Sequence, residues 1–327
     1  MVRILIRLLA AILLSSPTGC SKPHGAADLQ TVLPGRLSEL GLYSDLRSGS
    51  VGADARPYRP TFTLWSDGAA KRRWVRLPEG TKIDTSDMDI WRFPVGTDFF
   101  KEFSIDGRRI ETRILRKVRP GEAGWAALSY SWNEAQDEAF AAPQGVVDAL
   151  GTKYDIPSAN DCMACHGGRP ERVLGFGAIQ LAHAPTSRDE LTLERLVAEQ
   201  RLSREPAAKI ALPGPPEDAA AVGYLFANCG HCHDGGRPPH PAFFRPPRFV
   251  DFSLNVRDLG SLDSTRAHAT ATLLAGGLPS RSHLILSRMA APGGQYMFRM
   301  PPVATQLVDE EGLALVSGWL QRLRLQH

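Results

Sequence analysis

Hydrophobic and polar residues alternate along the segment from Thr61 to Trp132. The alternating apolar positions include Phe62, Leu64, Val75, Leu77, Phe99, Phe103, Ile105, Leu128, Tyr130 and Trp132. A period of two places such side chains on one face of a β-strand. Asp106 and Gly107 have the composition of a tight turn between two of these runs. The pattern predicts an antiparallel β-rich domain over residues 59–150.

A helical period replaces this alternation near the end of the chain. The last predicted helix begins near Asp309, and its apolar stripe consists of Leu313, Val316, Trp319, Leu320 and Leu323. An earlier helix is predicted to open at Glu217 and Asp218, after a proline-rich boundary, and to run into Cys229. The second half of the chain is therefore expected to contain helices that pack through apolar stripes.

The first residues have the features of an export signal. Arg3 and Arg7 precede an apolar run that is too short to span a bilayer, and small residues lead to Cys20. A cysteine at this place predicts a lipoprotein signal over residues 1–20, with Cys20 as the lipidated residue. An ordinary signal peptide is the alternative. The polar residues that follow predict a tether and lead-in over residues 21–58.

Two copies of the pattern Cys-x-x-Cys-His lie beyond the predicted β-rich domain. The copies consist of Cys162, Cys165 and His166, and of Cys229, Cys232 and His233. In this pattern the two thiols bind the vinyl groups of a c-type haem, and the histidine binds its iron. Two copies predict two covalently bound haems. The first is expected in a haem-binding region over residues 151–212, and the second in a region over residues 213–327.

Zinc sites and redox dithiols are the competing interpretations of paired cysteines. A zinc ribbon places its two pairs about 15–20 residues apart, whereas Cys165 and Cys229 are much further apart. A thioredoxin-like site has a βαβ context and needs no histidine after each pair. The chain has 5 cysteines, which are accounted for by Cys20 and the two motifs. The sequence therefore leaves no pair for a structural disulfide.

The candidate for the sixth ligand of the second haem is a methionine between the second motif and the last helix. Met300 precedes Pro301 and Pro302, which favour a stiff extended loop that can hold a thioether over the haem ring. Met297 and Met289 are the alternatives.

The first haem has no equally clear sixth ligand. His183 is the nearest histidine after His166 and is one candidate. The other candidates are Met88, His268 and His283. A further alternative is that the first haem has no sixth protein ligand. Such an iron could bind a small molecule or peroxide.

Composition and charge exclude some classes of function. The chain has 327 residues, of which 43% are hydrophobic and 22% charged, as expected for a globular protein of two or three domains. A net charge of +3 gives no indication of a nucleic-acid partner. The basic run Lys71-Arg72-Arg73 predicts a solvated strand end, and a docking or haem-propionate-pairing site is the alternative.

Several strings of the sequence resemble a family of exported bacterial dihaem c-type cytochromes. Besides both haem motifs they are LSELGL at 37–42, LWSDGA at 64–69, WRFPVGT at 91–97, KEF at 101–103, ETR at 111–113, YSWNEAQ at 130–136, IPS at 156–158, SHL at 282–284 and RMPP at 299–302. The resemblance covers nearly all of the chain after residue 34. It implies covalent haem binding and electron transfer outside the cytoplasm. His183 departs from the family pattern, in which asparagine is expected after Gln180-Leu181, and this weakens its assignment as a ligand.

The predicted fold class is α+β multidomain, with an antiparallel β-rich N-terminal domain followed by mainly α, cytochrome c-like haem regions. The predicted function is electron transfer by a periplasmic, lipid-anchored dihaem cytochrome that exchanges electrons with redox partner proteins. A haem enzyme is the alternative, either peroxidase-like or the electron-accepting subunit of an exported dehydrogenase. A third interpretation is a β-domain binding module with accessory haems.

Overall fold

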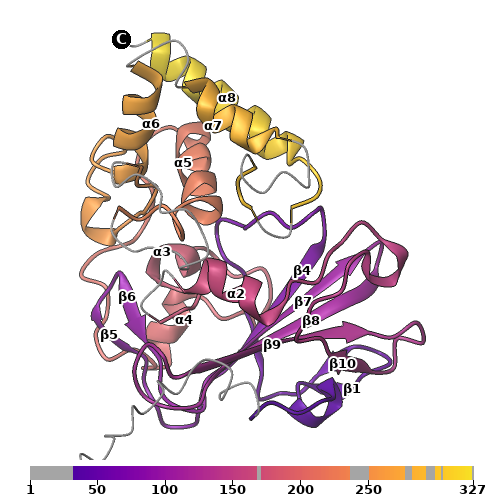
Figure 1. The fold of residues 1–327 in the computed structure, drawn as a ribbon. Helices are drawn as coiled ribbons and strands as arrows, with labels where there is room; N and C mark the ends of the chain where they lie inside the picture. The colour runs from indigo at the N-terminus through magenta and orange to yellow at the C-terminus, as the bar shows by residue number, and fades with distance from the viewer. Residues whose placement is uncertain are drawn as a thin grey trace, which may run out of the picture.

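A computed structural model of the chain (Figure 1) describes residues 32–167, 171–235, 250–276, 282–291, 299–302 and 305–325. The predicted signal segment with Cys20, and residues 21–31 of the predicted tether, lie outside the described residues. None of the described helices is both long enough and apolar enough to cross a membrane.

A six-stranded antiparallel sheet is the largest element of the fold (Figure 1). Its strands, in spatial order, are β10 Ala139–Ala141, β9 Trp125–Trp132, β8 Arg108–Lys117, β7 Asp98–Ile105, β4 Ala70–Arg76 and β3 Arg56–Pro57. Two ribbons are separate from this sheet, β1 Tyr43–Asp45 with β2 Ser50–Val51 and β5 Asp84–Asp87 with β6 Ile90–Arg92. Asp106 and Gly107 both have positive φ, at 50° and 78°, and turn β7 into β8 as their composition predicts.

The alternation of side chains gives the sheet two faces with different partners. Phe100 points to one face and packs with Leu37 of η1 Leu37–Leu40, which belongs to the N-terminal lead-in. Its neighbour Phe99 points to the opposite face. There it joins a core that continues through the haem-motif regions to Trp319 near the end of the chain. The second face is therefore the one whose core also includes residues of the segments that carry the two Cys-x-x-Cys-His motifs.

Short helices follow the sheet along the chain. They are η2 Ala149–Gly151, α2 Ala159–His166, α3 Ala178–Leu181, α4 Leu193–Ala198, α5 Pro216–Asn228, η3 Val256–Asp258, α6 Arg266–Gly276, α7 Ser282–Met289 and α8 Glu310–Leu325. The helices α5 and α8 agree with the predicted ones and share the same core, which includes Val222 and Val316. In Figure 1, α5 to α8 form a group at the end of the molecule that lies away from β10 and β1.

The predicted α+β multidomain fold with mainly α haem regions is wrong. Antiparallel sheet dominates a fold with 27% helix and 23% strand. In the first haem region the helices α2, α3 and α4 have only 8, 4 and 6 residues. The 30 glycines and 25 prolines of the chain interrupt many segments that could otherwise continue as helix. The apolar residues of the segments after the sheet join those of the sheet in one core, which runs from Tyr58 to Leu323.

Candidate functional site

The first Cys-x-x-Cys-His motif occupies α2, which lies against the sheet. Ser158 and Asp161 begin this helix with a reciprocal cap. The N–H and hydroxyl of Ser158 donate to Asp161 Oδ2 at 3.0 and 2.7 Å, and the Asp161 N–H donates to Ser158 Oγ at 3.2 Å. The cap satisfies N–H groups that a helix start leaves free. Cys162 and His166 lie one turn apart and line the space between α2 and the sheet.

A hydrogen bond to the backbone orients the imidazole of His166. Its Nδ1 contacts the carbonyl oxygen of Arg172. Only a protonated nitrogen can donate to a carbonyl, so Nε2 keeps its lone pair. Burial lowers the pKa of His166 to about 4, which keeps the ring neutral at physiological pH. A neutral imidazole with a hydrogen-bonded Nδ1 and a free Nε2 is the form that binds iron.

A buried ion pair fixes the loop that follows the first motif. The side chains of Lys117 and Glu171 are 2% and 7% exposed and form a salt bridge. Trp125 Nε1 also donates to Glu171 Oε2, at 3.2 Å. Because Glu171 immediately precedes Arg172, this pair holds in place the backbone carbonyl that orients His166.

The second motif begins where α5 ends. The Cys229 N–H donates to the Leu225 carbonyl at 2.8 Å, and the His233 N–H donates to the Cys229 carbonyl at 2.9 Å. Gly230 has no room for a side chain, because a Cβ there would lie 2.6 Å from the carbonyl oxygen of Phe252. The buried Nδ1 of His233 has no hydrogen-bond partner among the described residues. Burial lowers the pKa of His233 to about 4, so this imidazole is also neutral and able to bind a metal.

A loop from the β-rich part of the chain positions the start of the second motif. The Trp65 N–H donates to Asn228 Oδ1 at 2.8 Å, and Asn228 Nδ2 donates to a carbonyl oxygen of the same loop at 3.1 Å. Phe62 packs against α5 at Gly223, where a Cβ would lie 2.1 Å from the ring. The alternation of Phe62 and Leu64 therefore belongs to this loop and not to a strand, which corrects the sequence prediction for residues 61–68.

The same loop holds the segment that follows Met300. Asp67 Oδ1 accepts a hydrogen bond from the Leu307 N–H at 2.7 Å, and Trp65 Nε1 donates to the Leu307 carbonyl at 3.2 Å. The N–H of Met300 itself donates to the Arg288 carbonyl, at the end of α7, at 3.0 Å. One loop thus joins the start of the second motif to the segment of its predicted sixth ligand.

Folding brings the two motifs into contact. The side-chain ligand atoms of Cys165, His231 and Cys232 lie within 4.8 Å of one another. A hydrogen bond from the Cys232 thiol, together with His231, holds the pKa of Cys165 well below its usual range. His231 is buried, at 4% exposure. Sequence reasoning missed His231, because a histidine at a variable position of the motif has no evident role until the first motif is placed beside it.

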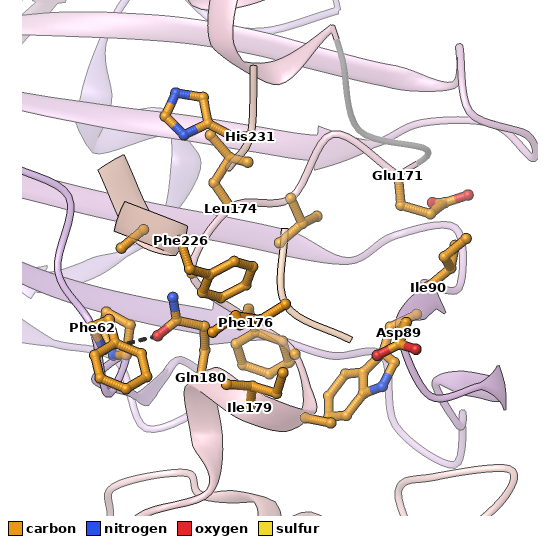
Figure 2. Close-up of a pocket in the computed structure, with 18 of the residues that line it drawn as sticks. Phe62, Asp89, Ile90, Glu171, Leu174, Phe176, Ile179, Gln180, Phe226 and His231 are labelled. Atoms are coloured by element: carbon orange, nitrogen blue, oxygen red, sulfur yellow. Dashed lines mark hydrogen bonds between the residues drawn. The ribbon is translucent and has the colours of Figure 1, made fainter. Parts of the chain in front are cut away.

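Three cavities adjoin the place where the motifs meet. One has a volume of about 520 Å³ and is lined in part by Cys162, Cys165, His166, His231 and Pro301. A second cavity of about 520 Å³ separates α2 from the sheet. The largest, of about 1010 Å³, is shown in Figure 2, where His231 and Glu171 lie toward the top of the view and Phe62, Phe176 and Phe226 lie below them. Leu174 and Lys101 line all three, so the cavities share walls.

The candidate sixth ligands lie in different places. Pro301, next to the half-buried Met300, lines the cavity that contains both motifs. His183 contacts the Arg59 carbonyl through Nε2 at 2.6 Å, and it is not among the described residues that line the three cavities. His268 lies near Trp319, with ring centroids 5.8 Å apart.

The remaining candidates are methionines and one histidine. Met88 lines the largest cavity, and Met289 packs against the large core. Met297 and the side chain of His283 lie outside the described residues. The structure therefore places Met88 at a wall of a cavity that His231 also lines, and leaves Met289 packed against the core.

The donor set of the two motifs fits covalently bound haem. Cys162, Cys165, Cys229 and Cys232 form no disulfide. Burial raises the pKa of Cys162 to about 11 and that of Cys229 to about 12, so both are protonated at physiological pH. Aromatic walls beside the thiols and the two neutral imidazoles match the apolar ring and the iron of a haem.

Comparison with known proteins gives no match: no family model fits the chain, and no curated protein and no solved structure is similar to it.

Proposed function

We propose that this protein is a dihaem c-type cytochrome that transfers electrons outside the cytoplasm. The observation that carries the proposal is the contact between the two motifs, in which Cys165, His231 and Cys232 lie within 4.8 Å of one another. A haem is bound by its cysteines along one edge. Two haems attached at cysteines this close together have neighbouring edges, which favours electron exchange between them.

The residues of the two motifs have complementary roles in this proposal. Bound haem supplies a one-electron centre. Cys162 and Cys165 hold the first haem, and Cys229 and Cys232 hold the second. His166 and His233 would bind the two irons, and the hydrogen bond to the Arg172 carbonyl sets the orientation of His166. Met300 would supply a thioether to the second iron. The aromatic side chains of the cavity walls would contact the rings.

The sixth position of the first haem distinguishes an electron relay from an enzyme. Among the described residues of the cavity that contains His166, His231 is the other histidine, and none is a methionine. A haem enzyme, peroxidase-like or part of an exported dehydrogenase, would use an open position here. Carbon monoxide added to the reduced protein measures this directly. Absence of an absorbance shift favours the relay, and a shift in one haem favours the enzyme.

Haem staining after denaturing electrophoresis tests the proposal, because covalent haem survives denaturation. We expect the exported protein to stain. The variants Cys162→Ser/Cys165→Ser and Cys229→Ser/Cys232→Ser should each lose about half of the signal, one haem of two. Met88→Leu, at a cavity wall without a thiol, serves as the control and should stain fully. An unstained wild-type protein that binds zinc through Cys165, His231 and Cys232 would contradict the proposal.

A further inference from the structure

Three cationic side chains form a row across the face of the sheet that supports the first motif. Arg73 of β4 is directly opposite Lys101 of β7, and Lys101 is directly opposite Arg113 of β8. All three therefore point to the same face as Phe99. Like charges directly opposite each other destabilise a sheet, so the row requires negative charge nearby.

Among the described residues, a carboxylate pairs with only one end of this row. Arg113 donates to both carboxylate oxygens of Glu111, at 2.6 and 2.8 Å. Arg73 is only 6% exposed, and neither it nor the Lys101 amine has a hydrogen-bond or ion-pair partner among the described residues. The nearest aromatic contact of Lys101 is the ring of Phe103, with the amine 5.9 Å from its centroid. Neither side chain is therefore paired with a carboxylate in the part of the chain that the structure describes.

The acidic residues of the cavity walls are already engaged. Glu171 forms the ion pair with Lys117, and Asp161 caps α2 through Ser158. Asp89 accepts a hydrogen bond from the Val256 N–H at 2.6 Å. None of these carboxylates pairs with Arg73 or Lys101.

Both of these cations face the cavities beside the motifs. Arg73 lines the largest cavity, and Lys101 lines all three. Burial, followed by the charges of Arg73 and Arg113, lowers the pKa of Lys101 well below its usual range. An unpaired buried charge is strongly unfavourable. This face of the sheet therefore offers a place for negative charge beside the cavities that Arg73 and Lys101 line.

We propose that Arg73 and Lys101 bind the two propionate carboxylates of the haem attached at Cys162 and Cys165. This inference rests on the proposed function. The number of charges agrees, since two cations face two carboxylates. The position agrees as well, because Lys101 lines a cavity together with Cys162 and His166. The guanidinium of Arg73 can form paired hydrogen bonds with one carboxylate, and the Lys101 amine is a compact charge for the other.

Redox titration of the purified holoprotein tests this assignment. A cation beside a haem favours the reduced form, whose net charge is one unit more negative. In Lys101→Met we expect the midpoint potential of one of the two haems to fall by about 59 mV. For a one-electron couple this is about a tenfold shift of the redox equilibrium toward the oxidised form. Lys101→Arg should keep the wild-type potential. Lys82→Met removes an exposed lysine and should shift neither haem. If Lys101→Met does not fold, Arg73→Gln provides the same test.

The outcomes separate this proposal from the proposed function. Absence of haem stain in the wild type overturns both. Full haem stain in every variant, with potentials equal to those of Lys82→Met, overturns only the propionate assignment. Added succinate provides a third outcome. If it raises the thermal stability of the wild type but not that of Lys101→Met, the two cations bind a free dicarboxylate, and the propionate assignment is overturned.

Discussion

Buried charged residues around the first motif depend on single partners. In Lys117→Met, Glu171 loses its counter-ion while it stays buried against Trp125. We expect the free energy of unfolding to fall by about 3–5 kcal/mol, the usual effect of one unpaired charge in a protein interior. Urea unfolding followed by circular dichroism measures this, with Lys82→Met as a control for the loss of an exposed lysine.

The double variant Lys117→Met/Glu171→Leu separates the ion pair from simple packing. Removal of both charges leaves no unpaired group, so most of the lost stability should return. A double variant that is as unstable as the sum of the two single variants would show that the pair does not act as a unit.

Glu190 makes the stability of the chain depend on pH. Burial raises the pKa of this carboxyl, but hydrogen bonds from the N–H and hydroxyl of Thr186, with Arg59 nearby, lower it to a net value below 4.5. A lower pKa in the folded state means that the carboxylate stabilises the fold above the pKa of the unfolded chain, about 4.3. This contribution is lost as the pH falls through the folded pKa.

We therefore expect Glu190→Gln to be less stable than the wild type at neutral pH. The difference should shrink as the pH falls below the pKa of the unfolded carboxyl and disappear below the folded pKa. Unfolding free energies measured across this range test the sign. Glu194→Gln, an exposed neighbour in α4, should show no such pH dependence. A constant difference between wild type and Glu190→Gln at every pH would refute the role of the charge.

The basic run at 71–73 shows how far residue patterns can be interpreted from sequence. Its interpretation as a solvated strand end holds for Arg72, which is exposed and pairs with Glu102 at 2.8 Å. Arg73 is buried because successive side chains of β4 point to opposite faces. The sequence alone does not reveal which of the two points inward, or that Lys101 lies opposite Arg73.

At the scale of elements, the sequence predicts the strands and long helices better than their surroundings. Alternation through Phe99 and Phe103 identifies β7, and the apolar stripe with Trp319 identifies α8. The same alternation at Phe62 and Leu64 fails, because these residues lie in a loop, where the Phe62 ring packs against α5 at Gly223. Period alone cannot distinguish an extended loop against a helix from a strand in a sheet.

The loop over residues 61–68 joins the β-rich part of the chain to the second motif. Asn228→Ala removes the acceptor for the Trp65 N–H and two donated hydrogen bonds. Because this leaves buried backbone groups unsatisfied, we expect a loss of about 1–3 kcal/mol in the free energy of unfolding. Asn160→Ala, at an exposed position of α2, is the matched control. Equal stability of the two variants would exclude this role of Asn228.

At the scale of the whole molecule, the sheet brings together two motifs that lie far apart in the sequence. Each motif is recognisable from its own residues, but the contact of Cys165 with Cys232 depends on where α2 and the end of α5 dock. The fold-class prediction was wrong for the same reason. The two Cys-x-x-Cys-His motifs suggested separate helical domains, whereas here their segments join one core with the sheet.

The predicted export signal gives a test on the whole protein in cells. If Cys20 carries a lipid, Cys20→Ala should move the protein from the membrane fraction to a soluble fraction and abolish labelling by a radioactive fatty acid. The haem stain of any exported Cys20→Ala protein should be unchanged, because this cysteine lies in neither motif. Membrane association without label in the wild type would contradict lipidation.

Electron paramagnetic resonance of the fully oxidised protein tests most directly that two haems lie side by side. Two neighbouring ferric haems interact magnetically. We expect the wild-type spectrum to differ from the sum of the spectra of Cys162→Ala/Cys165→Ala and Cys229→Ala/Cys232→Ala, each of which retains one haem. A wild-type spectrum equal to that sum would contradict the contact between the two motifs as the basis of electron transfer.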